Sequence, residues 1–108
     1  MTDGSREDRG TGPVDASVPF YTIGQASQLL GIQPAALRRI EEQEIVIPGR
    51  SEGGQRRYSG DDLARLREVV ELTDEGVTLP GVRKVLALRQ RVSDLEAELT
   101  HARVQREG

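Results

Sequence analysis

Arginine side chains recur in two groups whose spacing suits contact with phosphate groups. Arg38 and Arg39 form the first group, and Arg50, Arg56 and Arg57 form the second. A guanidinium group can bind a phosphate, or read guanine, through two parallel hydrogen bonds. The two groups therefore indicate contact with a nucleic acid, unless they are only solvated surface charges.

The first group lies in a segment whose pattern predicts two short helices joined by a tight turn. Thr22 can cap the first helix, with Gln25 as the other half of a capping box, and Gly31 can end it. Pro34 suits the first position of the second helix. This geometry places a recognition helix in the major groove of DNA, although short helical hairpins also occur in proteins that never bind DNA. The apolar residues expected on the inner faces are Ile23, Ala26, Leu29, Leu30, Leu37 and Ile40.

The second group lies in a segment that predicts a small hairpin, or wing. Residues 45 to 47 are β-branched and precede Pro48, which is typical of a strand. Gly53-Gly54 offers a tight turn, and residues 55 to 58 can return as the second strand. The wing arginines, opposed locally by Glu52, then suit a loop that follows phosphates or enters a minor groove. The alternative is an ordinary charged loop.

The wing is followed by signals for a third and a fourth helix. Ser59 and Asp62 form a second capping box, and Thr78 can cap the fourth helix. The expected buried stripe of the third helix is Leu63, Leu66, Val69, Val70 and Thr73.

The fourth helix carries apolar residues at alternating spacings of three and four, which is a heptad seam. A helix from residue 79 to about 104 would be nearly 40 Å long at about 1.5 Å per residue, so the seam predicts a homodimeric coiled coil. The alternative is an amphipathic helix packed on its own domain. Its flanking charges fit two arrangements: a parallel coil would pair Arg91 with Glu96, and an antiparallel coil would pair Arg89 with Glu96. The expected interface residues are Val85, Leu88, Val92, Leu95, Leu99 and Ala102.

The composition excludes several classes of function. The chain of 108 residues has no cysteine and one histidine, His101, which argues against disulfides, a metal site and thiolate sensing. We find no nucleophile–base pair or phosphate loop, so we expect no enzyme and no cofactor. No apolar run suits a membrane span or signal peptide, so we expect a cytoplasmic, nucleoid-associated protein. The net charge of −3 still permits a local basic face, because acidic residues concentrate in the tail, helix backs and coil.

A series of residues recurs in a fixed order over residues 20 to 100: Tyr21-Thr22-Ile23-Gly24, Ala26, Leu30-Gly31-Ile32, Pro34, Leu37-Arg38, Glu41, Pro48, Arg50, Gly54, Arg56, Tyr58-Ser59 and Asp62-Leu63. The run LTDEGVTLPGV follows at residues 72 to 82. The series resembles the N-terminal DNA-binding domain of the MerR family of bacterial transcription regulators, and the later run is similar to the heat-shock-repressor branch of that family.

The resemblance implies roles for individual residues. It makes Arg38 a recognition-helix contact, matches Arg50 and Arg56 to wing contacts, and matches Arg83 to a phosphate contact. It favours a supporting role for Tyr58 and an antiparallel coil. The sequence departs from the family pattern at Arg39 and Ile40, where the family has two aromatics, at Glu44-Ile45, where it has Gly-Leu, and at Gln55, where Tyr is common. The candidate DNA-binding residues are Thr22, Gln33, Ala36, Arg38, Arg39, Arg50, Arg56, Arg57, Tyr58 and Arg83.

The predicted fold is mainly α with a small β-hairpin, a winged helix-turn-helix domain followed by a long C-terminal coiled-coil helix. We expect a disordered arm at residues 1–19, the winged domain at 20–78, the dimerisation helix at 79–105 and a frayed tail at 106–108. The predicted function is that of a dimeric transcription regulator, a repressor at a pseudo-palindromic operator. We expect no effector-binding domain, so the regulation of the protein would come from a protein co-regulator, temperature, abundance or the arm. Two alternatives remain open, a DNA-architectural or excisionase-like winged-helix protein and a coiled-coil protein-interaction adaptor.

Overall fold

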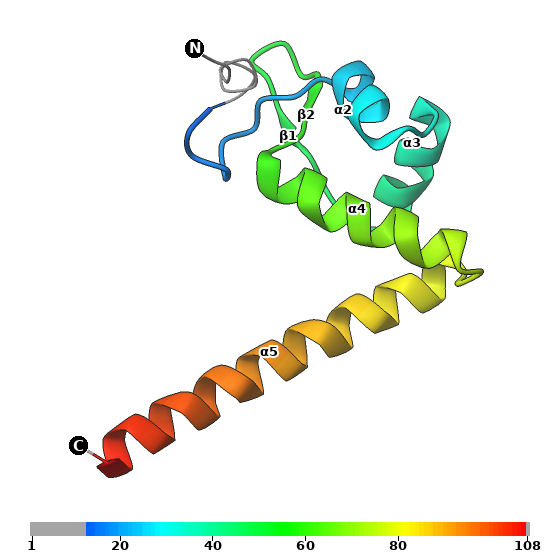
Figure 1. Ribbon diagram of the computed structural model, residues 1–108. Coiled ribbons are helices and arrows are strands. Elements are labelled where there is room, and N and C mark those ends of the chain that lie inside the picture. The colour runs from blue at the N-terminus through cyan, green and yellow to red at the C-terminus, as the bar shows by residue number, and fades with distance from the viewer. Residues whose placement is uncertain (1–12, 108) are drawn as a thin grey trace, which may run out of the picture.

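The computed structural model describes residues 13–107 as a small helical domain from which one long helix projects (Figure 1). The elements follow the order α2, α3, β1, β2, α4 and α5. The mainly α fold with a two-stranded antiparallel hairpin is confirmed. Residues 1–12 of the expected arm lie outside the described residues. Residues 13 to 19 form a turn that reaches α4, where the amide of Asp61 donates a hydrogen bond to the carbonyl of Ala16.

Helices α2 (Ile23–Leu30) and α3 (Pro34–Glu42) form the expected helix-turn-helix. The Thr22 hydroxyl accepts a 3.0 Å hydrogen bond from the Gln25 amide, and the Gln25 side chain accepts one of 2.9 Å from the Thr22 amide. The capping box is therefore confirmed. Gly31 ends α2 with φ 71°, a left-handed conformation that costs glycine little. Leu29, expected on the inner face, is instead 54% exposed, and Ala26 is the fully buried residue of α2.

The chain leaves α3 through a bend, and this corrects the expected first strand. Ile45 and Val46 are both buried, whereas consecutive residues of a strand would point to opposite faces. Glu44 has φ 58°, which turns the chain so that both side chains enter the core. Strand β1 therefore begins at Gly49, and the wing is shorter than residues 45 to 58.

The wing consists of β1 (Gly49–Arg50) and β2 (Arg56–Arg57), each two residues long. Their register places Arg50 opposite Arg56. Tyr58 extends the wing by a bridge to Tyr21, with its amide donating to the Tyr21 carbonyl at 2.7 Å and its carbonyl accepting from the Tyr21 amide at 2.8 Å. The bridge fixes the start of α2 beside the wing.

Helix α4 (Gly60–Asp74) forms the base of the core. The Ser59–Asp62 capping box is confirmed, since each backbone amide donates to the other residue's side chain. The inner face differs from the expected stripe at its end, because Thr73 is exposed and Leu72 is buried. The Thr73 hydroxyl donates to the carbonyl of Val70 within its own helix.

Helix α5 (Leu79–Glu107) is the projecting helix in Figure 1, and it runs two residues beyond the expected end at 105. Val82 and Leu86 are buried against the domain, and Val85 is partly buried there. Every residue from 87 to 107 is exposed. The long helix is therefore anchored in the core by its first turns, and beyond Leu86 only exposed residues such as Arg89 still face α4.

Candidate nucleic-acid interface

Four of the candidate DNA-binding residues meet at a shallow hollow between the start of α2 and the wing. Thr22, Arg50, Arg56 and Arg57 line this hollow, whose volume is about 280 Å³. The hollow lies there because the Tyr21–Tyr58 bridge ties the residue before Thr22 to the end of β2. Arginines that line a concave surface can bind a phosphate by charge-assisted hydrogen bonds. We call this surface, lined by Thr22 and the three arginines, the wing hollow.

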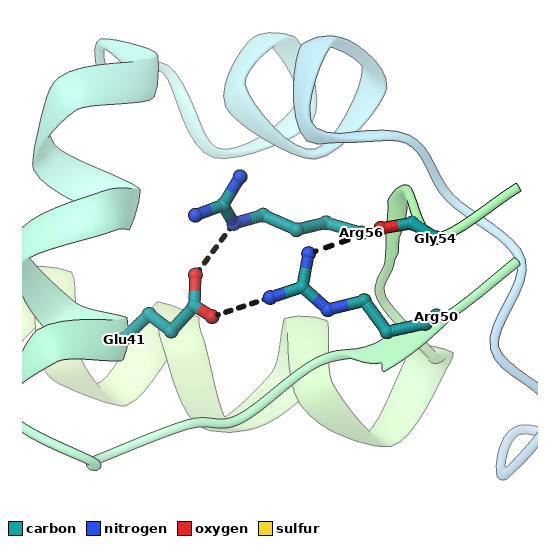
Figure 2. Close-up of polar contacts among 4 residues, drawn as sticks. All are labelled: Glu41, Arg50, Gly54 and Arg56. Carbon is teal, nitrogen blue, oxygen red and sulfur yellow. Dashed lines mark hydrogen bonds and ion pairs between the residues drawn. The ribbon is translucent and has the colours of Figure 1, made fainter.

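Glu41 holds two of these arginines from the last turn of α3. One carboxylate oxygen accepts a hydrogen bond from Nε of Arg56, and the other accepts one of 3.1 Å from Nη2 of Arg50. Arg50 also reaches the Gly54 carbonyl with Nη1 at 3.4 Å. Figure 2 shows the carboxylate between the two arginines, with the remaining nitrogens of Arg56 on the far side of its guanidinium from Arg50. The hydrogen bond to Glu41 raises the pKa of the Arg56 guanidinium above its ordinary value.

Glu41 was not among the functional residues predicted from the sequence. It was only one position of the family pattern, because its contacts with Arg50 and Arg56 span 9 and 15 residues of sequence. A local signal was available, since an acid three residues after Arg38 shares a helix face with it.

The helix α3 presents its predicted residues on two different sides. Gln33 and Arg38 are exposed, and Arg38 lies one turn before Glu41, on the same side of the helix. Ala36 and Arg39 line a separate hollow of about 310 Å³, together with Ile40 and with residues of the α2–α3 turn, α4, the α4–α5 loop and α5. Arg38 is therefore on the side of α3 that carries Glu41, whereas Ala36 and Arg39 line a different hollow from the wing arginines.

Two further candidates have contacts within the protein. Tyr58 is 1% exposed, and among the described residues its hydroxyl has no hydrogen-bond partner. Burial raises the pKa of the Tyr58 hydroxyl, with a further increase from the Glu41 carboxylate. Arg83 donates a 3.1 Å hydrogen bond from Nη1 to the carbonyl of Gln43, at the end of α3. The contacts of Tyr58 and Arg83 therefore suit a role in holding the elements of the interface in place.

The seam residues of α5 are apolar and open to solvent. Leu88, Val92, Leu95 and Leu99 are between 47% and 64% exposed. The seam thus leaves the domain after Val85, which the core partly covers. The alternative of a helix packed along its whole length on its own domain does not fit this arrangement.

Among residues 13–107, no group of three or more histidine, cysteine, aspartate or glutamate side chains could hold a metal ion. Within the same residues, no helix combines the length and apolar character that a bilayer crossing requires.

Comparison with known proteins identifies the family. The model of the MerR HTH family of regulatory proteins matches residues 21–88. HspR of Streptomyces coelicolor is 40% identical over 80 residues, which cover 73% of this chain and 53% of HspR. The HTH-type transcriptional regulator GlnR of Bacillus anthracis is 30% identical over 72% of this chain and 60% of GlnR. The chain thus spans little more than half the length of these curated relatives.

A solved structure of a MerR family regulator has a similar fold. The crystal structure of HiNmlR, a MerR family regulator lacking the sensor domain and bound to promoter DNA, superposes with a TM-score of 0.58. It is 24% identical, and the match covers 79% of this chain and 75% of that one. The resemblance seen in the sequence is confirmed, and the chain belongs to the MerR helix-turn-helix family of regulatory proteins.

Proposed function

We propose that the chain is a sequence-specific, dimeric transcription regulator that represses a promoter at a pseudo-palindromic site in the cytoplasm. The observation that carries the proposal is the wing hollow lined by three arginines, two of which are bound by Glu41 of α3, the helix that also carries the exposed Arg38. A helix and a wing on one face are the arrangement with which winged helix-turn-helix proteins enter a major groove and hold the flanking phosphates. The name of one relative, the HTH-type transcriptional regulator GlnR, agrees with this role.

The dimer is the second part of the proposal, and the exposed seam of α5 supports it. Side chains such as Leu88 and Leu99 would leave an apolar stripe in water along a helix of about 40 Å. Burying such a stripe against a second copy stabilises the pair by roughly 25 cal/mol per Å² of apolar surface. A two-fold dimer then reads two half-sites, and the coil fixes their separation.

The sizes of the seam residues favour an antiparallel coil with one register. In that register Val85 of one copy meets Ala102 of the other, Leu88 meets Leu99, and Val92 meets Leu95. The small Ala102 side chain falls where the domain already crowds Val85. All six seam residues are used, and each large side chain has a partner.

The charges beside the seam favour the same register. It sets Arg89 of one copy against Glu96 of the other, and Arg91 against Glu98. A slip of one heptad in one direction would set Arg89 against Arg89 and Arg91 against Arg91. A slip in the other direction would set Glu96 against Glu96. Like charges in these positions destabilise a coil, so both slipped registers are disfavoured.

The proposal is tested by footprinting the purified protein on genomic fragments that include its own promoter. We expect two protected half-sites related by two-fold symmetry, with an affinity that falls as salt rises. Bending of DNA with little preference for any site would favour the architectural alternative. A monomer in sedimentation that ignores duplex DNA at low salt would rule the proposal out.

Two variants separate the parts of the proposal. Arg38→Ala should weaken binding to the footprinted site by about 1–3 kcal/mol if Arg38 reads a base, and should weaken binding to all sequences equally if it contacts phosphate. Leu95→Asp should yield a folded monomer with sharply reduced affinity, because it buries a charge in the seam. Ala97→Asp is the matched control, since Ala97 lies on the outer face of the same helix.

A further inference from the structure

The carboxylate of Glu41 lies where the recognition helix α3 meets the wing, and both of its oxygens are used. Its side chain is 18% exposed, against 48% for Arg50 and 31% for Arg56. Arg50 and Arg56 are directly opposite each other in the two-residue strands. Like charges in that position destabilise a hairpin, and strands this short are marginal without support from the rest of the fold. The Glu41 carboxylate offsets the repulsion between the two arginines, and it also ties the short strands to α3.

Arg50 and Arg56 differ in how many of their guanidinium nitrogens are bound within the protein. Arg50 is engaged at both ends of its guanidinium, by Glu41 and by the Gly54 carbonyl at the turn of the wing. Arg56 gives only Nε to Glu41, so its Nη nitrogens have no hydrogen bond to any described residue, and Arg56 also lines the wing hollow. Arg57, by contrast, donates to the carbonyl of its neighbour Arg56 and has no contact with Glu41.

We propose that Glu41 is a positioning residue that locks the wing to the recognition helix, with Arg50 as the tie and the outer nitrogens of Arg56 presented to DNA. This inference rests on the proposed DNA-binding function. The lock makes α3 and the wing hollow move as one rigid unit, so that both engage the same half-site in register. Preorganised contacts of this kind raise affinity for the correct partner by lowering the cost of ordering the surface.

The first test uses the DNA-free protein and therefore does not depend on the proposed function. Glu41→Gln keeps the size of the side chain and removes its charge, and Glu42→Gln makes the same charge change one residue later, at an exposed position. Amide hydrogen exchange is measured at Ser51 and Gly54, whose amides donate to the carbonyls of Gln55 and Ser51 within the wing. We expect exchange at both amides to become about tenfold faster in Glu41→Gln and to stay unchanged in Glu42→Gln. Equal exchange in the two variants would overturn the proposal.

The second test measures preference for a DNA sequence. The probes are the tightest-binding duplex that the wild-type protein selects from a random library and a scrambled duplex of the same composition. Glu41→Gln should lower the preference for the selected duplex by about tenfold, because binding must then order the wing. Glu42→Gln should shift both affinities alike, as a change of net charge does. If both variants shift them alike, Glu41 acts through its charge alone and the proposal fails.

Arginine variants complete the test. Arg50→Gln should speed exchange at Ser51 and Gly54, whereas Arg57→Gln should leave that exchange unchanged and reduce the salt dependence of duplex binding. If the Ser51 and Gly54 amides exchanged as slowly in Arg50→Gln as in the wild-type protein, Arg50 would not be the tie. If the wing amides respond as expected but the wild-type protein selects no duplex, the lock stands and the proposed DNA-binding function fails.

Discussion

Arg83 in α5 donates a hydrogen bond of 3.1 Å to the backbone carbonyl of Gln43, the residue that ends α3. The bond joins the recognition helix to the helix that carries the dimer seam. Arg83→Met should therefore lower the free energy of unfolding by about 0.5–1.5 kcal/mol, because a helix-end carbonyl loses its charged partner. Urea denaturation checks this expectation, with exposed Lys84→Met as the control.

The same variant distinguishes support from DNA contact. The family resemblance implies that Arg83 touches phosphate. In that case Arg83→Met would leave the unfolding free energy unchanged and would reduce the salt dependence of duplex binding. A loss of stability together with an unchanged salt dependence would assign Arg83 to holding α3 in place.

Glu44 occupies a conformation that suits glycine, with φ 58°. A side chain there costs roughly 1–2 kcal/mol, while glycine loses about 0.5–1 kcal/mol more backbone freedom on folding. Glu44→Gly should therefore stabilise the domain by about 0.5–1 kcal/mol in thermal or urea unfolding. Glu42→Gly, at the last residue of α3, should not stabilise it, because the backbone there is already helical and glycine lowers helix propensity. If Glu44→Ala stabilised it as much as Glu44→Gly, charge and not backbone strain would be the cause.

The features that the sequence predicted well are local. The capping boxes at Thr22 and Ser59 each depend on residues three positions apart, so their signal lies within one turn of helix. The start of β1 could not be predicted in the same way, because the β-branched run at residues 45 to 47 also suits a bend that fills the core. Its outcome depends on the left-handed Glu44, where the pattern offers no glycine.

In the candidate site, too, the local features could be predicted from the sequence and the tertiary contacts could not. That arginines would gather near the recognition helix followed from their positions, and the wing hollow brings Arg50, Arg56 and Arg57 together. How they are held did not follow, because Glu41 reaches them across a tertiary contact that no spacing rule describes. The DNA-contact roles of these residues stay predictions.

Tyr58 offers a test of packing behind the wing. Its hydroxyl is buried without a hydrogen-bond partner among the described residues, which costs free energy that the ring alone would not. Tyr58→Phe should therefore leave stability at pH 7 unchanged or raise it by up to about 1 kcal/mol. A loss of more than about 1 kcal/mol in urea denaturation would mean that the hydroxyl does have a partner.

Alkaline pH should destabilise the wild-type domain through the same residue. Burial raises the folded-state pKa of Tyr58 above the ordinary 10.0, so above that pH the unfolded chain loses its Tyr58 proton first. The unfolded state then binds fewer protons, and stability falls as pH rises through the folded-state pKa. Urea midpoints measured from pH 8 to pH 11 should fall less for Tyr58→Phe than for the wild type. Parallel curves would exclude Tyr58 as the titrating group.

The orientation of the coil can be tested by reversing charges. Arg89→Glu should weaken the dimer, because it sets a glutamate against Glu96 of the other copy in the antiparallel register, and adding Glu96→Arg should restore it. The two symmetric contacts together should contribute about 0.5–2 kcal/mol, measurable as a change in the dimer dissociation constant by sedimentation equilibrium. In a parallel coil, Glu96→Arg would instead rescue Arg91→Glu, because residues 91 and 96 would then face each other. Arg89 also lies 3.8 Å from Glu68 of its own chain, so Glu68→Gln serves as the control that isolates the contact between copies. If Glu96→Arg rescued the dimer of Arg91→Glu but not that of Arg89→Glu, the coil would be parallel and the antiparallel arrangement would be wrong.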